Sequence, residues 1–318
     1  MIYDVIVIGA GPAGLTSAIY TARRTLKTLI LAKDLGGQMA TTSDIENYPG
    51  FENVISGFEL ANKMKNQAEK FGAEFKLGTV NKIEKISENN FKIFFNNNES
   101  VETQSVILAF GLTPRNLDVP GEKEFRGKGV TYCANCDAPL YKNKIVAVVG
   151  GGNCALDAAD YLSKIASKTY LIHRRDKFRA EEVVINEIIR NNKIEIIYDS
   201  IVTAIKGEKL VKSLDVKNLK TNKEKEIALN GIFIEVGRKA STEFLEGIVE
   251  LNEKKEVIVD SNGVASQAGI FAAGDITNVS QKQIAVASGE GVKAALSAYT
   301  YLLKKRGQSI PGVDWGKK

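Results

Sequence analysis

Histidine and cysteine, two residue types on which much catalysis and cross-linking depend, are scarce in this chain. Its 318 residues include one histidine and three cysteines. The single histidine, His173, excludes any mechanism that needs a histidine base other than His173 itself. Three cysteines are too few for the disulfide framework of a secreted domain, so a closely spaced pair indicates redox or metal chemistry instead.

Long apolar runs and clusters of like-charged residues are also absent. No stretch approaches the roughly 18 to 20 consecutive apolar residues of a membrane-spanning helix. The first apolar run, 5–8, has no basic segment before it, which favours a strand over a signal peptide. The net charge of +5 comes from scattered lysine and arginine and gives no reason to expect nucleic-acid binding. We therefore expect a cytoplasmic protein without membrane or nucleic-acid partners.

What the sequence does contain is an internal repeat. Residues 4–34 and 143–175 repeat one pattern, with Gly150 in the place of Gly9, and each copy has a β-branched run, a glycine-rich turn, an alanine-rich helix and a second short strand. Two such β-α-β units predict an α/β fold with two Rossmann-like, three-layer nucleotide-binding domains, the second inserted in the first. The expected first domain comprises 1–112 and 246–318, the expected second domain 113–245, and the expected tail 305–318.

The first glycine turn is a full GxGxxG fingerprint, Gly9-Ala10-Gly11-Pro12-Ala13-Gly14, between a strand and a helix. Its first glycine allows a tight turn, its second lets the backbone approach a pyrophosphate, and its third packs helix on strand. The helix amino terminus adds free N–H groups and partial positive charge for the phosphates. The ribose-binding acid expected after the second strand is replaced by Ala32, and Asp34 is the nearest substitute.

The second glycine turn, Gly150-Gly151-Gly152-Asn153-Cys154-Ala155, is the accepted GxGxxA variant. By the repeat offset, His173-Arg174-Arg175 replaces the ribose-binding acid, with Arg179 shortly after. Arginines at this place bind a 2′-phosphate through charge-assisted hydrogen bonds, which favours NADPH over NADH. The alternative is a solvated basic strand end. Cys154 is expected to be a small buried residue of the turn.

A cysteine pair, Cys133 and Cys136, lies just ahead of the second turn. A zinc site needs four ligands, which the chain does not offer, so no metal is expected. A purely structural disulfide would close too small a loop to stabilise much, and a reducing compartment opposes it. A redox dithiol that exchanges through a mixed disulfide is the favoured interpretation. Asp137 is the best candidate for proton transfer to these thiols, and helix capping is its alternative role.

On these motifs the chain resembles the low-molecular-weight thioredoxin reductases of bacteria and archaea, in the class II pyridine nucleotide-disulfide oxidoreductase family, along nearly its whole length. The resemblance implies tightly bound, non-covalent FAD in the first domain and a homodimer through the FAD domains. Electrons would pass from NADPH to FAD, to the Cys133–Cys136 disulfide, and to thioredoxin or a thioredoxin-like protein. Cys136 would lie next to the flavin, and Cys133 would attack the partner. The matching stretches are 9–14, 36–38, 46–50, 133–137, 150–155, 173–179 and 272–275.

The resemblance also assigns cofactor-binding residues. Those implied for FAD are Gly9, Gly11, Pro12, Ala13, Gly14, Gly37, Gln38, Thr42, Asn47, Val80, Ala109, Gly111, Gly274, Asp275, Lys282, Gln283 and Ile284. Those implied for NADPH are Gly150, Gly152, Asn153, Cys154, Ala155, His173, Arg174, Arg175, Arg179 and Gly237.

Four positions depart from the family pattern and keep other functions open. They are Ala32, Phe110, Ala158 and Lys282. One alternative is a disulfide reductase of the same fold that receives electrons from ferredoxin or another reduced flavin. Another is a reductase that serves a peroxiredoxin-like or glutaredoxin-like partner. The third is a redox sensor that binds FAD without turnover.

Overall fold

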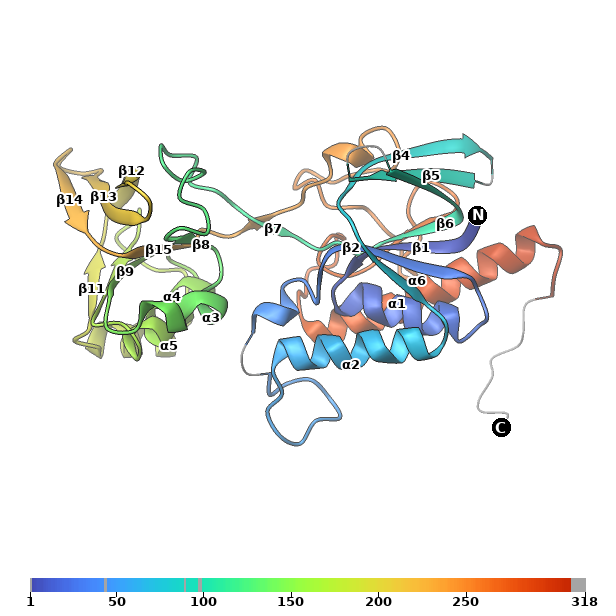
Figure 1. Cartoon of the computed structure of the whole chain (residues 1–318), viewed down its shortest axis with the longest axis horizontal. Helices are drawn as coiled ribbons and strands as arrows, with labels where there is room; N and C mark the ends of the chain where they lie inside the picture. Colours follow the sequence, from blue (N-terminus) through green and yellow to red (C-terminus); the bar gives the residue numbers. More distant parts are fainter. Residues whose placement is uncertain (1, 43–44, 89, 97–98, 310–318) are drawn as a thin grey trace. The chain divides into compact units, whose positions relative to one another are not determined.

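The chain forms two compact units (Figure 1). The computed structural model describes residues 2–42, 45–88, 90–96 and 99–309, but not the side chains of Asn135 and Cys136. Unit 1 combines the residues up to Leu112 with those from Ala240 on, and unit 2 is Thr113–Lys239. The sequence places the second boundary after Leu245 instead. Ala240 and Leu245 are both buried in a core cluster of unit 1.

Unit 1 is built on a seven-stranded sheet in the order β3-β2-β1-β6-β5-β4, with β17 also paired to β6. The strands β3, β2, β1, β6 and β17 run parallel, and β4 and β5 are antiparallel additions. One half of β6 pairs with β5 and the other half with β17, so a strand from late in the chain completes the sheet. The strands are β1 Ile2–Ala10, β2 Thr28–Leu35, β3 Glu74–Leu77, β4 Val80–Ser87, β5 Asn90–Phe95, β6 Glu99–Leu108 and β17 Ile270–Ala272.

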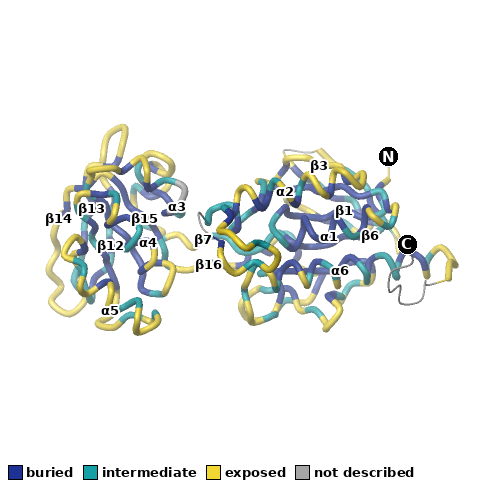
Figure 2. The backbone as a smooth tube through the Cα atoms, turned by 90° about the horizontal axis from the view of Figure 1, so that it is seen from below, coloured by how far each residue is buried: buried dark blue, intermediate teal, exposed yellow. Residues whose placement is uncertain are grey.

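Helices α1 (Pro12–Ala22), α2 (Gly57–Lys70) and α6 (Ile284–Lys305) share one core cluster with the sheet (Figure 2). A Cβ atom on Gly291 of α6 would lie 2.3 Å from the Ala13 carbonyl oxygen, so α1 and α6 touch through backbone. Ser17 Oγ lies 2.8 Å from the Ala13 carbonyl oxygen and 3.0 Å from that of Gly291.

Unit 2 has a five-stranded parallel sheet in the order β11-β10-β9-β15-β8. Alternate residues of β9 face opposite sides: Val146 and Val148 belong to the cluster with α4 and α5, whereas Ala147 and Val149 pack with β12, β13 and β14. Burial on both faces explains why these strands are continuous apolar runs. The larger elements are β9 Ile145–Gly150, α4 Asn153–Ser163, β10 Lys168–Ile172, α5 Glu182–Arg190, β11 Ile194–Ile197, β12 Ser200–Gly207, β13 Val211–Asn218, β14 Glu224–Ala228 and β15 Gly231–Glu235.

Short elements complete both units. The short strands are β7 Thr113–Pro114, β8 Val130–Thr131 and β16 Arg238–Lys239, and the short helices are η1 Met39–Thr41, α3 Ala134–Asp137, η2 Ala138–Tyr141 and η3 Glu243–Leu245. Strand β7 lies at the start of unit 2 and β16 at its end, and the two strands pair with each other. Both chain connections between the units therefore start from one two-stranded ribbon. The predicted α/β fold with two Rossmann-like domains is confirmed. Within the described residues no helix is long and apolar enough to cross a membrane.

The backbone contact at Gly291 predicts a strong dependence of stability on that residue. The change Gly291→Ala should lower stability by roughly 1–3 kcal/mol, because the added methyl group has no space against the Ala13 carbonyl. Gly289→Ala is the matched control in the same helix: a Cβ there meets nothing within 4 Å, so stability should stay or rise. Thermal unfolding of both variants checks this, and equal melting temperatures would contradict it.

Candidate nucleotide sites and dithiol

The first glycine turn forms a cradle with one open side. Gly9 has φ +109°, and a Cβ atom on it would lie 2.4 Å from the Ala109 carbonyl oxygen. A Cβ on Gly14 would lie 2.0 Å from the Gly9 carbonyl oxygen. On Gly11, in contrast, the nearest atom would be the Gly36 carbonyl oxygen at 3.8 Å. The outer glycines are therefore fixed by packing, and the middle one leaves room for a bound group.

Helix α1 begins at this cradle without a side-chain cap. Its N-cap is Gly11, and Pro12 occupies the first turn. Helix α2 is different, since the Ser56 side chain accepts a hydrogen bond from the Glu59 N–H at 3.2 Å. No side chain caps the first N–H groups of α1, and an uncapped helix start beside an open glycine is the arrangement that binds a phosphate.

Residues distant in sequence close around the cradle. A Cβ on Gly37 would lie 3.8 Å from the Gly11 Cα atom. The Gln38 side-chain amide donates to Asp275 Oδ2 at 3.3 Å and to the Leu112 carbonyl at 3.4 Å. The structure therefore brings together the glycine turn, the segment after β2 and the segment after β17, as the sequence motifs require.

The loop after β17 is held from two sides. The Gly274 N–H donates to Glu290 Oε2 at 2.7 Å, and burial raises the pKa of Glu290. Lys282 Nζ donates to the carbonyls of Asp275 and Thr277 at 3.0 and 2.7 Å, and it lies 3.4 Å from Glu256 Oε1. The departure at Lys282 thus has a role of its own, because the ammonium group fixes the loop that carries Asp275.

Other predicted residues of unit 1 lie outside these contacts. Asn47 is exposed, and within the described residues no hydrogen bond joins its side chain to the cradle. Val80 is the first residue of β4. Ala32 is buried in β2, where its carbonyl accepts from the Gly78 N–H at 2.8 Å. Asp34 is exposed. Phe110 packs on Phe244 with ring centroids 5.3 Å apart, which gives that departure a structural role.

The second glycine turn repeats the arrangement of the first. A Cβ on Gly150 would lie 2.4 Å from the Glu235 carbonyl oxygen, whereas one on Gly152 would meet nothing within 4 Å. Ala155 is fully buried. Helix α4 starts after Gly152 without a side-chain cap. Asn153, its first residue, exchanges two hydrogen bonds with Glu181, at 3.0 and 3.3 Å.

Two residues of α4 bear on what the sequence predicts: Cys154, which was expected to be buried, and Ala158, which departs from the family pattern. Cys154 is exposed, not buried as expected, because it shares the outward face of α4 with Asp157 one turn later. Ala158 lies on the inward face and is buried in the apolar cluster, where a charged side chain would have no partner.

In the segment after β10 the histidine is buried and the arginines are exposed. The His173 ring is buried, with 5% of the residue exposed, and its Nε2 lies 3.0 Å from the Lys177 carbonyl oxygen. Burial is the main cause that lowers the pKa of His173 below its usual value. Arg174, Arg175 and Arg179 are exposed, and within the described residues no ion pair links them to a carboxylate. These three side chains are free to meet an anion.

The cysteine pair lies at the start of α3. Cys133 is disulfide-bonded and Cys154 is free, whereas the Cys136 side chain lies outside the described part of the chain. The Asp137 carboxylate accepts a hydrogen bond from the Thr131 hydroxyl and makes no capping bond as the N-cap of η2. The same hydroxyl accepts from the Cys133 N–H at 3.2 Å. Thr131 therefore links the proposed nucleophile to the proposed proton carrier.

Sequence reasoning missed Thr131 and also Glu235. Glu235 ends β15, opposite Gly150, at the edge where ligands bind in open α/β sheets. Burial raises its pKa to about 7, although Arg238 opposes the shift. Its position, one strand from the glycine turn, is the only sequence signal that could have identified it. Among the described residues no group of three or more histidine, cysteine, aspartate or glutamate side chains could hold a metal ion.

Known proteins resemble this chain along nearly its whole length. The family model of the pyridine nucleotide-disulphide oxidoreductases matches residues 3–291. The thioredoxin reductase of Bacillus subtilis (strain 168) is 40% identical over 303 residues, which cover 95% of both proteins. The crystal structure of Lactococcus lactis thioredoxin reductase matches with a TM-score of 0.85 and 40% identity, over 95% of this chain and 99% of that one. A ferredoxin-flavin thioredoxin reductase from Clostridium acetobutylicum matches at 31% identity and a TM-score of 0.52, over 95% and 99%.

The raised pKa of Glu235 predicts a pH-dependent loss of stability. Because the folded pKa of about 7 exceeds the ordinary 4.5, the folded state holds its proton longer, and stability falls as pH rises between these values. The loss is on the order of 3 kcal/mol at most. In Glu235→Gln this loss should vanish, whereas the exposed control Glu187→Gln should follow the unmodified protein. Thermal unfolding from pH 5 to 8 tests this, and parallel curves for all three proteins would contradict it.

Proposed function

The chain belongs to the pyridine nucleotide-disulphide oxidoreductase family, and we propose that it is an NADPH-dependent thioredoxin-disulfide reductase. The observation that carries the proposal is the pair of open, uncapped glycine turns, one in each unit, together with a disulfide-bonded Cys133 ahead of the second. The partner would be thioredoxin or a thioredoxin-like protein, the substrate named by the relatives.

We propose that unit 1 holds FAD, because its residues fit such a group. The open side at Gly11 and the free N–H groups of α1 would hold the pyrophosphate. Gln38, Asp275 and the start of α6 would surround the rest of the molecule. When bound, the flavin would accept two electrons from a reduced nicotinamide and deliver them to the disulfide.

The proposed preference for NADPH rests on unit 2. The turn at Gly152 offers the same open backbone to a pyrophosphate as the turn at Gly11. The exposed side chains of Arg174, Arg175 and Arg179 would bind the 2′-phosphate, and a planar guanidinium group can do so with two hydrogen bonds. NADH lacks this phosphate and would bind more weakly.

The proposed thiol chemistry uses the Cys133–Cys136 pair. Once the disulfide has received two electrons, the Cys133 thiolate attacks the disulfide of the partner and forms a mixed disulfide. The first partner sulfur leaves as a thiolate and receives, through Asp137, the proton that the Cys133 thiol gave up. The Cys136 thiolate then attacks Cys133 sulfur, which restores the internal disulfide and releases the second partner sulfur. Thr131 orients both Cys133 and Asp137 through its hydroxyl group.

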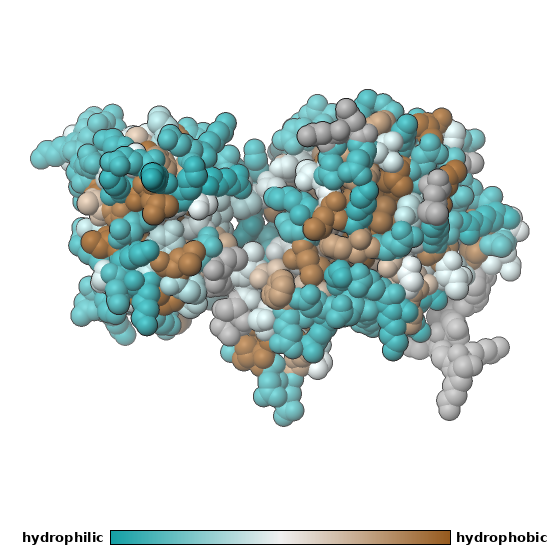
Figure 3. All heavy atoms as spheres, in the orientation of Figure 1, coloured by the Kyte–Doolittle hydropathy of each residue, from teal (hydrophilic) through white to brown (hydrophobic). Residues whose placement is uncertain are grey.

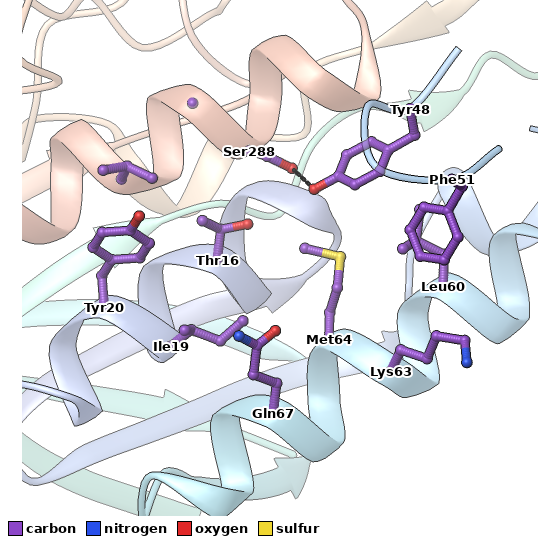
Figure 4. A pocket seen from close by; sticks show the side chains of 12 residues that line it. Thr16, Ile19, Tyr20, Tyr48, Phe51, Leu60, Lys63, Met64, Gln67 and Ser288 are labelled. Atoms are coloured by element: carbon purple, nitrogen blue, oxygen red, sulfur yellow. Dashed lines mark hydrogen bonds between the residues drawn. The ribbon is translucent and has the colours of Figure 1, made fainter. Parts of the chain in front are cut away.

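We also propose a homodimer that forms through unit 1. Its surface has a pocket of about 360 Å³ between α1, α2 and α6, lined by Tyr48, Phe51 and Met64 (Figure 4). Phe58 on α2 is 59% exposed, and apolar side chains interrupt the hydrophilic surface of this unit (Figure 3). An exposed apolar region of this kind supports a protein contact. Sedimentation as a monomer at micromolar concentration would contradict the proposal.

A cytoplasmic location is the last part of the proposal. It agrees with a cysteine pair that must be reduced in each turnover. Recovery of the protein from a secreted fraction would contradict it.

The first experiment is anaerobic mixing of the FAD-loaded protein with NADPH and, separately, with NADH, while the visible absorbance of the flavin is followed. Rapid bleaching by NADPH, slower bleaching by NADH and subsequent reduction of a purified bacterial thioredoxin are expected. Bleaching by reduced ferredoxin but by neither nucleotide would favour the alternative enzyme class that the Clostridium acetobutylicum match represents. Bleaching without reduction of any thioredoxin would indicate a different disulfide partner.

The Thr131 contacts predict a specific defect in thiol exchange. The change Thr131→Val should lower the rate of thioredoxin reduction roughly 10- to 100-fold, since a hydrogen bond to a charged group contributes about 1.5–3 kcal/mol. Thr131→Ser keeps the hydroxyl and should retain most of the rate. Flavin reduction by NADPH serves as the internal control and should not change in either variant. Equal rates in the Val and Ser variants would contradict the proposed role.

A further inference from the structure

The only histidine of the chain lies between the two loops that would hold a nucleotide. Its ring contacts the 174–179 loop, called here the arginine loop, through the Lys177 carbonyl, 3.0 Å from Nε2. The backbone of Gly150 in the glycine turn also favours the protonated ring. A Cβ on Gly151 would lie only 2.2 Å from the ring, so the turn packs directly on His173.

The same two loops are joined by a second link. The Arg179 N–H donates to the Gly151 carbonyl at 2.8 Å. Phe178 also packs against the ring, with a centroid distance of 5.2 Å. Because His173 is buried among these contacts, its ring cannot itself extend to a phosphate in solvent. It sets the position of the arginine loop relative to the glycine turn.

The hydrogen bonds of this ring are complete in only one protonation state. A neutral imidazole has one N–H group, whereas the backbone of Lys177 and that of Gly150 both favour a proton on this ring. The protonated ring could donate to both, but burial and the nearby Arg175 and Arg179 oppose the added charge. A bound phosphate would offset the charge of these arginines and remove part of that opposition.

Other charged groups near the ring do not oppose its protonation in the way that Arg175 and Arg179 do. Within the described residues, Asp176 and Asp199 form their ion pairs with Lys220, at 3.5 and 3.0 Å. Lys177 contributes its carbonyl. Tyr198 contacts Phe178 rather than the histidine, with ring centroids 5.2 Å apart. The two arginines are therefore the charges through which a ligand would act on His173.

We propose that His173 is a positioning residue that joins the arginine loop to the glycine turn, and that it takes up a proton from solvent when a 2′-phosphate binds to that loop. The inference rests on the proposed preference for NADPH. It assigns His173 an indirect role in recognition of the 2′-phosphate, in place of the direct contact expected from the sequence. One consequence is that NADP⁺ should bind more tightly at lower pH through this residue.

A single histidine makes the proposal directly measurable. In untagged, FAD-loaded protein labelled with ¹³C-histidine, the ring Cε1–H group gives one signal whose shift reports the protonation of His173. The signal is followed against pH in the free protein, with saturating NADP⁺, and with NAD⁺, which lacks only the 2′-phosphate. The expected result is a midpoint below 6.5 in the free protein, a higher midpoint with NADP⁺, and little change with NAD⁺.

The outcomes separate this inference from the proposed function. Binding of NADP⁺ without a change of the midpoint would overturn the inference and leave the NADPH preference intact. Failure of NADP⁺ to bind would overturn the preference itself, and the inference would fall with it. An equal shift with NAD⁺ would also overturn the inference, because the 2′-phosphate would then not be its cause.

Two variants act on the ring from different sides. His173→Asn keeps one hydrogen-bond donor but cannot titrate, so it should weaken NADP⁺ binding roughly tenfold and flatten its pH dependence between pH 5.5 and 7.5, with little effect on NAD⁺. Gly151→Ala keeps the histidine but displaces its ring, and it should weaken NADP⁺ binding to a similar extent. If the first variant does not fold, the second permits the same titration. Unchanged NADP⁺ affinity in Gly151→Ala would overturn the positioning role.

Discussion

The backbone N–H groups left free at the starts of α1 and α4 are the constraint on which the rest of the structure depends. Each helix begins after a glycine on which an added Cβ atom would contact almost nothing. Other residues of the same turn are tightly packed. The packed neighbours fix the turn, and the open glycine leaves its polar groups accessible. A helix start without a cap costs stability unless a ligand satisfies it, so a bound phosphate would stabilise both units.

Much of this arrangement could be predicted from sequence because its causes are local. The β-α-β repeat, the two glycine turns and the long final helix each follow from a few adjacent residues whose preferences agree. The cysteine pair and the arginines of 174–179 were likewise found by spacing alone. The sequence signal of each of these parts lies within one short segment, so it can be recognised without knowledge of the distant contacts.

The features that sequence reasoning missed depend on contacts between distant segments. Gln38 and Asp275 were each assigned to the FAD site by the resemblance, but their hydrogen bond joins residues 237 positions apart and is visible only in the folded chain. Cys154 was expected to be buried and is exposed, because the face that a helical residue presents depends on what packs against the helix. The burial of His173 depends on Gly151, and the titration of Glu235 depends on the strand that flanks it. Local sequence does not encode such environments.

The discontinuity of unit 1 bears on how the protein is made. Its sheet is completed by β17, and its first helix packs on α6, so elements from both ends of the chain must meet. Unit 2 is continuous, Thr113–Lys239, and emerges from the ribosome earlier. During synthesis, unit 2 can therefore acquire its core while unit 1 still lacks a strand and a helix. The cradle between β1 and α1, although encoded first, becomes a rigid site last.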